Sequence, residues 1–162
     1  MEPVRYVDLL NRRYAAQGFP PYRWTVNNST PFTPLAKPLR DCRISMLTSG
    51  GVSRCASAPW NPDAKNDLRL DQIASDAPTS DFQIHDSYYD HRDADRDLNC
   101  IFPLDRLREL AAEGAIGAVA ERMWSGFMGR IYVRSAVENE SAPALARELE
   151  RDEVDLFVLV PS

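Results

Sequence analysis

A continuous apolar run near the end of the chain restricts the fold more than any other feature. Residues 155–160 read Asp-Leu-Phe-Val-Leu-Val, without the polar alternation of a half-exposed strand. Such a run is typical of a strand covered on both faces, as in a parallel sheet. Residues 43–48, Arg-Ile-Ser-Met-Leu-Thr, predict a second buried strand, which ends in the turn sequence Ser49-Gly50-Gly51.

Helical patterns lie between these two strands. Residues 103–113 predict a helix, because Pro103 suits the first helical position and Gly114 suits the position after the last turn. Leu107 and Leu110 fall on one face of this helix and are expected to pack against the strand near the end of the chain. The other predicted elements are a helix at 141–151, with Ser141 as its N-cap, and short strands at 68–73 and 116–120. Strands that alternate with helices predict an α/β layered fold with a mostly parallel sheet and flanking helices.

The first 40 residues have a different composition from the rest. Residues 4–17 predict a short helix, and residues 19–40 contain five prolines, which fix the backbone and remove hydrogen-bond donors. We therefore expect an N-terminal helix and proline-rich arm at 1–40 and an α/β domain at 41–162. A chain of 162 residues can bury a core of its own.

Charge and cysteine content narrow the classes of partner. The formal net charge of −5 argues against nucleic acid or an anionic membrane as the main partner, since both bind basic surfaces. No apolar stretch is long enough to span a bilayer, and the first residues lack the apolar core of a secretory signal. Three cysteines at irregular spacing indicate free thiols. Together these features predict a cytoplasmic protein.

One loop gathers the titratable groups of the chain. Residues 85–97 hold both histidines and five acidic residues, directly before the helix that begins at Pro103. His85 is a candidate acid or base because histidine titrates near neutral pH, and a structural histidine is the alternative. No metal is expected, because the carboxylates alternate with Arg92 and Arg96 and the spacing fits no common ligand pattern.

Two further features carry candidate chemistry. The turn at Ser49-Gly50-Gly51 either simply reverses the chain or binds a ligand beyond the carboxyl end of its strand, and we expect it to border a pocket with the 85–97 loop. Cys55 is a candidate nucleophile, because the neighbouring Arg54 would favour a thiolate. Chance placement of this cysteine is the alternative.

These motifs together resemble a known family. Two of the matching segments are residues 47–52, Leu-Thr-Ser-Gly-Gly-Val, and residues 79–81 together with His85 and Tyr89-Asp90. The most specific segment runs from Asp97 to Leu110 and includes Asn99-Cys100-Ile101-Phe102-Pro103. They are similar to the selenoprotein B family of glycine, sarcosine, betaine and D-proline reductases, and most of all to its D-proline reductase members. Ser53 and Met123 stand where histidines are expected in the family.

The resemblance implies a subunit of a dithiol-dependent reductase that cleaves a carbon–nitrogen bond of a small amino acid or amine. It implies a selenocysteine or cysteine nucleophile after the strand that ends at Val160, hence beyond Ser162, and no cofactor in this chain itself. The implied partners are a subunit that bears a pyruvoyl group or a thiol reductant protein, with oligomerisation left open. The chain alone is then expected to be inactive as a reductase.

In this interpretation His85 and Cys55 are the catalytic candidates. The substrate-binding candidates are Ser49, Gly50, Gly51, Tyr89, Asp90, Asp97 and Asn99. A non-catalytic subunit or a small-molecule binding protein on the same scaffold is the alternative.

Overall fold

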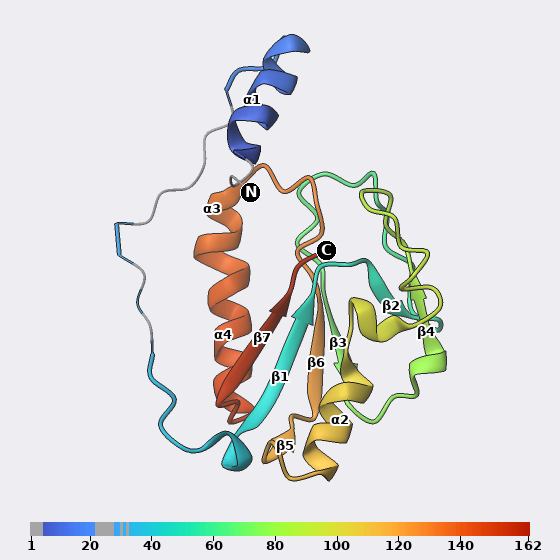
Figure 1. The fold of residues 1–162 in the computed structure, drawn as a ribbon, viewed down its shortest axis with the longest axis vertical. Coiled ribbons are helices and arrows are strands. Elements are labelled where there is room, and N and C mark those ends of the chain that lie inside the picture. Colours follow the sequence, from blue (N-terminus) through green and yellow to red (C-terminus); the bar gives the residue numbers. More distant parts are fainter. Residues whose placement is uncertain (1–4, 22–27, 30, 32) are drawn as a thin grey trace. The chain divides into compact units, whose positions relative to one another are not determined.

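The computed structural model describes residues 5–21, 28–29, 31 and 33–162 (Figure 1). The chain divides into two compact units, residues 1–34 and residues 35–162. In the first unit, α1 (Tyr6–Ala16) forms where residues 4–17 predict a helix, and Gly18 follows it with a φ of +81°. Part of the predicted proline-rich arm, at 22–27, 30 and 32, lies outside the described residues.

A five-stranded mixed sheet forms the centre of the second unit. β1 (Arg43–Thr48) pairs in parallel with β7 (Leu156–Val160) on one side and with β5 (Ala118–Val119) and β6 (Arg122–Gly126) on the other. β3 (Leu70–Ala74) runs antiparallel to β6 at one edge. The prediction of an α/β fold with a mostly parallel sheet is confirmed.

A second, two-stranded sheet and several short 3₁₀ helices accompany the main sheet. β2 (Val52–Arg54) pairs antiparallel with β4 (Phe82–Ile84), and neither strand is predicted from the sequence. The short 3₁₀ helices are η1 (Leu39–Asp41), η2 (Thr79–Asp81) and η3 (Leu98–Cys100).

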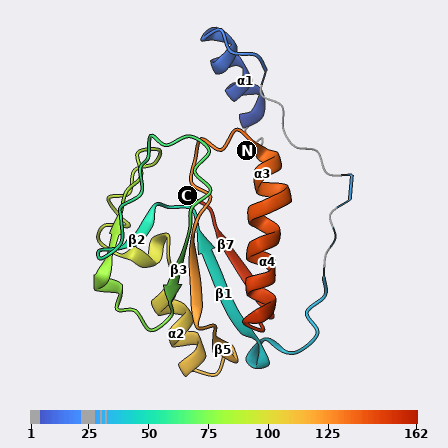
Figure 2. The ribbon, with the colours of Figure 1, turned by 180° about the vertical axis from the view of Figure 1, so that it is seen from behind.

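The helices of this unit cover opposite faces of the sheet. Along β1, Ile44 and Met46 face the cluster that contains residues of α2 (Leu104–Ala112). Leu47 faces the other cluster, which contains Leu145 of α4 (Ala142–Arg151). The helical stretch from α3 (Arg134–Ala136) through the π-helical turn η4 (Val137–Ser141) to α4 runs alongside β7 in both views (Figures 1 and 2).

Two details of the helices differ from the sequence prediction. Ser141 is not an N-cap, because the helical backbone continues through it and its hydroxyl group donates to Ala136 O at 3.3 Å. The buried stripe of α2 contains Leu104 and Leu107, whereas Leu110 is 39% exposed. Leu107 packs in the same cluster as Leu156 and Val158, as expected, but the prediction for Leu110 is wrong because the stripe continues through Ala111 instead.

Candidate functional site

The turn after β1 is held tightly by its own hydrogen bonds. Gly50 N donates to Thr48 Oγ1 at 3.1 Å, and Ser49 N donates to Val160 O at 3.2 Å. Gly51 has a φ of +68°, in the left-handed region that glycine adopts without strain. The turn therefore lies at the carboxyl ends of β1 and β7, where ligands collect in open α/β sheets.

The loop after β4 packs directly onto this turn. His85 N donates to Gly51 O at 3.0 Å, and the hydroxyl group of Tyr89 donates to Gly50 O at 2.9 Å. A Cβ atom at Gly51 would lie only 2.5 Å from His85 O, so the close approach of the two segments requires glycine. The expected contact between the turn and the 85–97 loop is present.

The segment after β7 reaches the same place. Ser162 N donates to Ser49 Oγ at 3.1 Å. A Cβ atom at Gly50 would lie 3.1 Å from the hydroxyl oxygens of both Tyr89 and Ser162. We call this group, made of Ser49–Gly51, His85, Tyr89 and Ser162, the edge site.

His85 brings an unpaired ring nitrogen to the edge site. Its Nδ1 atom is buried and has no hydrogen-bond partner among the described residues. A buried polar atom without a partner is costly, and Trp124 Nε1 and Ser125 Oγ are unpaired in the same way, so His85 Nδ1 is available to a group that binds at the site without requiring one. The role of His85 as an acid or base stays a prediction.

Tyr89 is held in its neutral form. Burial, together with the negative charges of Asp86 and Asp95, raises the pKa of its phenol to about 12. The protonated hydroxyl group therefore remains a donor to Gly50 O at physiological pH. Tyr89 fixes the turn and does not supply a phenolate.

Replacing Tyr89 by phenylalanine is expected to destabilise the fold by about 1 kcal/mol, because Gly50 O loses its donor. It should also change the response to alkali. The phenol's pKa is higher in the folded state than its unfolded value of about 10, so its contribution is present below pH 10 and is lost as pH rises toward about 12. Urea midpoints measured between pH 8 and 12 should therefore fall less steeply in Tyr89→Phe than in the unmodified chain.

The matched control for this prediction is Tyr132→Phe. Tyr132 is 67% exposed, so removal of its hydroxyl group should leave the midpoint at pH 8 unchanged. Equal loss of stability in the two variants would show that the bond from Tyr89 to Gly50 contributes nothing specific.

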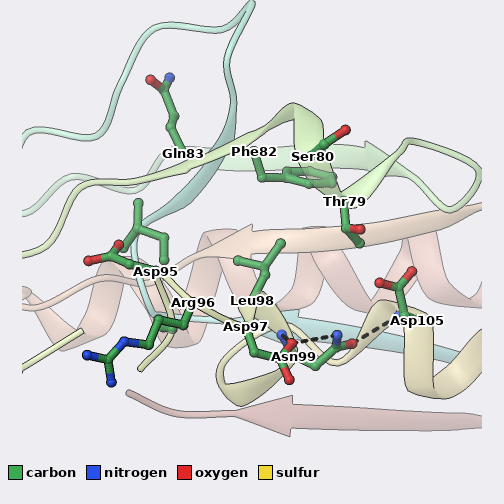
Figure 3. A pocket seen from close by; sticks show the side chains of 12 residues that line it. Thr79, Ser80, Phe82, Gln83, Asp95, Arg96, Asp97, Leu98, Asn99 and Asp105 are labelled. Atoms are coloured by element: carbon green, nitrogen blue, oxygen red, sulfur yellow. Dashed lines mark hydrogen bonds between the residues drawn. The ribbon is translucent and has the colours of Figure 1, made fainter. Parts of the chain in front are cut away.

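Asp97 and Asn99 line a separate pocket of about 500 Å³ (Figure 3). Asp97 Oδ1 accepts hydrogen bonds from the backbone N and side-chain Nδ2 of Asn99, which lower the pKa of Asp97. Asn99 Oδ1 in turn accepts from Asp105 N in the first turn of α2. The pocket is lined by residues 79–80, 82–84 and 94–99 with Asp105. Neither the turn nor His85 is among its lining residues, so this pocket is separate from the edge site.

Asp90 and Cys55 are not joined to the edge site by any described contact. Asp90 is exposed and ion-paired with Arg92, whose hydrogen bonds lower the pKa of Asp90. Cys55 is exposed at the end of β2, about 13 Å along an extended chain from Gly51. Arg54 was expected to favour a thiolate at Cys55, but its guanidinium forms a salt bridge with Asp81 that compensates its positive charge.

Metal ligands do not converge among the residues that the structure describes. No group of three or more histidine, cysteine or acidic side chains is placed there to hold an ion. His91 Nδ1 instead lies 3.0 Å from Asp95, one helical turn away in sequence. In the same described part of the chain, no helix is long and apolar enough to cross a membrane.

The loop after β6 contacts the 85–97 loop at Tyr88. Phe127 and Arg130 both adopt positive φ, which is uncommon outside glycine. Arg130 hydrogen-bonds to the hydroxyl group of Tyr88, and its guanidinium lies 5.6 Å from the centre of the Tyr88 ring. The available signal is the pair of glycines, Gly126 and Gly129, among large apolar residues.

The fold and the edge site define an α/β protein whose candidate chemistry lies at the carboxyl edge of a parallel strand pair. The sequence profile of the glycine/sarcosine/betaine reductase selenoprotein B family matches residues 3–162. The chain therefore belongs to this family, which confirms the resemblance found in its motifs.

Individual relatives agree with this assignment. The chain is 34% identical over 128 residues to D-proline reductase subunit gamma of Acetoanaerobium sticklandii, covering 79% of the chain and 52% of that subunit. It is 28% identical to glycine reductase complex component B subunit gamma of Peptoclostridium acidaminophilum, over 76% of the chain and 28% of that subunit. The same subunit of Symbiobacterium thermophilum is 28% identical, over 96% of the chain and 37% of the relative.

The chain thus spans about half the length of the D-proline reductase subunit and a smaller share of the glycine reductase subunits. No solved structure gives a significant match.

Proposed function

We propose that this chain forms part of a selenoprotein B-type reductase subunit that cleaves the carbon–nitrogen bond of a small amino acid or amine. The observation that carries the proposal is the edge site. There the turn after β1, the loop with His85 and Tyr89, and the residues after β7 meet within hydrogen-bond distance. The resemblance implies a redox residue directly after β7, hence at this edge of the sheet.

The proposed reaction balances with a dithiol as reductant. A primary amine substrate in its protonated form takes up two electrons and two protons, its carbon–nitrogen bond breaks, and the carbon gains hydrogen while ammonium leaves. The dithiol supplies both electrons and both protons as it becomes a disulfide. The resemblance implies that a redox residue beyond Ser162 and the pyruvoyl group of a partner subunit would supply the nucleophilic and electrophilic chemistry.

The residues of this chain would bind and orient the substrate and transfer a proton to it. Ser49 N and Gly50 N already donate to Val160 O and Thr48 Oγ1, so within the turn Gly51 N would be the peptide group that binds an anionic group such as a substrate carboxylate. His85 would transfer a proton to the departing amine, and Tyr89 would keep the turn in place. Asp97 and Asn99 brace the start of α2 and would act on the site indirectly.

A dithiol-dependent assay tests the proposal, with glycine, sarcosine, betaine and D-proline as substrates. It compares the chain of 162 residues with a version extended by the coding sequence downstream of Ser162, each with and without partner subunits of a reductase. We expect turnover only in the extended version, with His85→Ala losing most of it.

His91→Ala is the control for loss of an imidazole from the same loop, because His91 pairs with the half-exposed Asp95 and its ring lies edge-on to that of Tyr89, with 5.9 Å between the centroids. Its turnover should remain well above that of His85→Ala. Turnover by the short chain that disappears in Cys55→Ser would overturn the proposal and make Cys55 the nucleophile.

A second candidate function is the binding of a small molecule without chemistry. The observation that favours it is the pocket in Figure 3, whose volume of about 500 Å³ is within the range of small-ligand sites. Calorimetric binding of the same four compounds, weakened by Asp97→Asn in the absence of any turnover, would favour this candidate.

A further inference from the structure

The outer edge of β7 is more apolar than is usual for an unpaired edge strand. β7 reads Leu-Phe-Val-Leu-Val, five apolar residues without a charge or a proline. It pairs with β1 along one side in an unbroken register, and no described strand pairs with its other side. Natural edge strands are blunted by lysine, proline or a bulge, because their free N–H and C=O groups bind other strands. β7 contains none of these devices.

The burial of β7 does not match its sequence. Five of the six residues of β1 are buried, whereas none of the five residues of β7 is. The contrast is sharpest for two cross-strand partners, since Leu47 in β1 is 5% exposed and Leu159 in β7 is 65% exposed. The sheet is therefore well covered over β1, whereas the residues of β7 are only half-buried and Leu159 is exposed, although both strands have the apolar pattern of covered strands.

We propose that a further extended strand, supplied by another part of a selenoprotein B-type reductase subunit, pairs with the outer edge of β7 and covers Leu159. The choice of occupant rests on the proposed function. The match takes in 52% of D-proline reductase subunit gamma, so nearly half of that subunit lies outside it and is a source of such a strand. The edge is apolar and uncharged, so it suits an apolar strand and offers no charge to attract an acidic or basic segment.

The added strand would also contribute to the edge site. β1, β6 and β7 run in parallel, and Val160 O accepts the hydrogen bond from Ser49 N. A strand that continues this parallel order ends at the same edge as the turn at Ser49–Gly51. Its last residues would then lie beside Ser162 and Ser49, so docking would place further side chains next to the substrate.

The test is co-expression of the tagged chain with the part of the A. sticklandii subunit that lies outside the match. We expect the two polypeptides to purify as a complex in which the amides of residues 156–160 exchange hydrogen roughly tenfold more slowly than in the chain alone. Leu159→Lys should weaken the complex roughly tenfold or more, because it places a charge at the covered edge.

The matched control is Leu110→Lys, the same substitution at an exposed leucine of α2, which should leave the complex unchanged. Absence of a complex, or protection away from β7, would overturn the inference. A dimer of the chain alone with protected β7 amides would also overturn it, since a second copy would then be the occupant.

The reductase assay separates this inference from the proposed function. If the complex protects the β7 amides but shows no turnover, the proposed reductase activity is contradicted and the proposed strand pairing at β7 stands. If an extended chain shows turnover while its β7 amides still exchange rapidly, only the proposed strand pairing at β7 is contradicted.

Discussion

Replacing Gly51 by alanine is expected to destabilise the protein by about 3 kcal/mol, because two costs combine at this position. The backbone has a φ of +68°, which alanine adopts only with strain. The new Cβ atom would also lie 2.5 Å from His85 O and 2.8 Å from His85 C, both of them backbone atoms that cannot rotate away. Urea unfolding measures the loss, and hydrogen exchange at His85 N reports whether its bond to Gly51 O is broken.

Gly114→Ala separates these two costs. Gly114 has a similar φ of +73°, but a Cβ atom there would meet nothing within 4 Å. Its replacement should therefore cost only the backbone strain, about 1 kcal/mol. Equal losses in the two variants would contradict the close packing of the 85–97 loop on the turn, and with it the edge site.

Continuous or periodic apolar patterns made the main elements predictable from sequence. β1 covers the predicted residues 43–48, and β7 and α2 each begin within one residue of the prediction. β6 could not be predicted in this way. It starts with a charged residue, Arg122, and ends with Gly126, so it lacks the apolar ends expected of a buried strand.

The edge site was predictable in outline but not in detail. The positions of the turn and of His85 relative to the predicted strands indicated that they would meet. The sequence could not show that Tyr89 donates to Gly50 O, nor that Arg54 is engaged by Asp81, because both contacts join residues far apart in the chain. The sequence therefore predicts a more reactive Cys55 than its surroundings in the structure support.

Leu107→Ala is expected to destabilise the fold by about 2–5 kcal/mol, the usual cost of emptying a buried leucine site. Leu107 is 9% exposed and packs in the cluster that also contains Leu156, Val158 and Phe102, so its removal would leave a cavity between α2 and the sheet. The free energy of urea unfolding should fall without a change in the slope, since the same surface is exposed on unfolding.

Leu110→Ala is the control, because the same atoms are removed from the same helix at a residue that is 39% exposed. Its cost should be lower, below about 2 kcal/mol, because a substantial part of the residue is already in contact with water in the folded state. If Leu107→Ala cost no more than Leu110→Ala, α2 would not be packed through the Leu104–Leu107 stripe. Asp105 N on this helix bonds to Asn99 Oδ1. A displaced α2 would therefore also move the Asp97–Asn99 segment, so the loss of packing would reach the wall of the pocket in Figure 3.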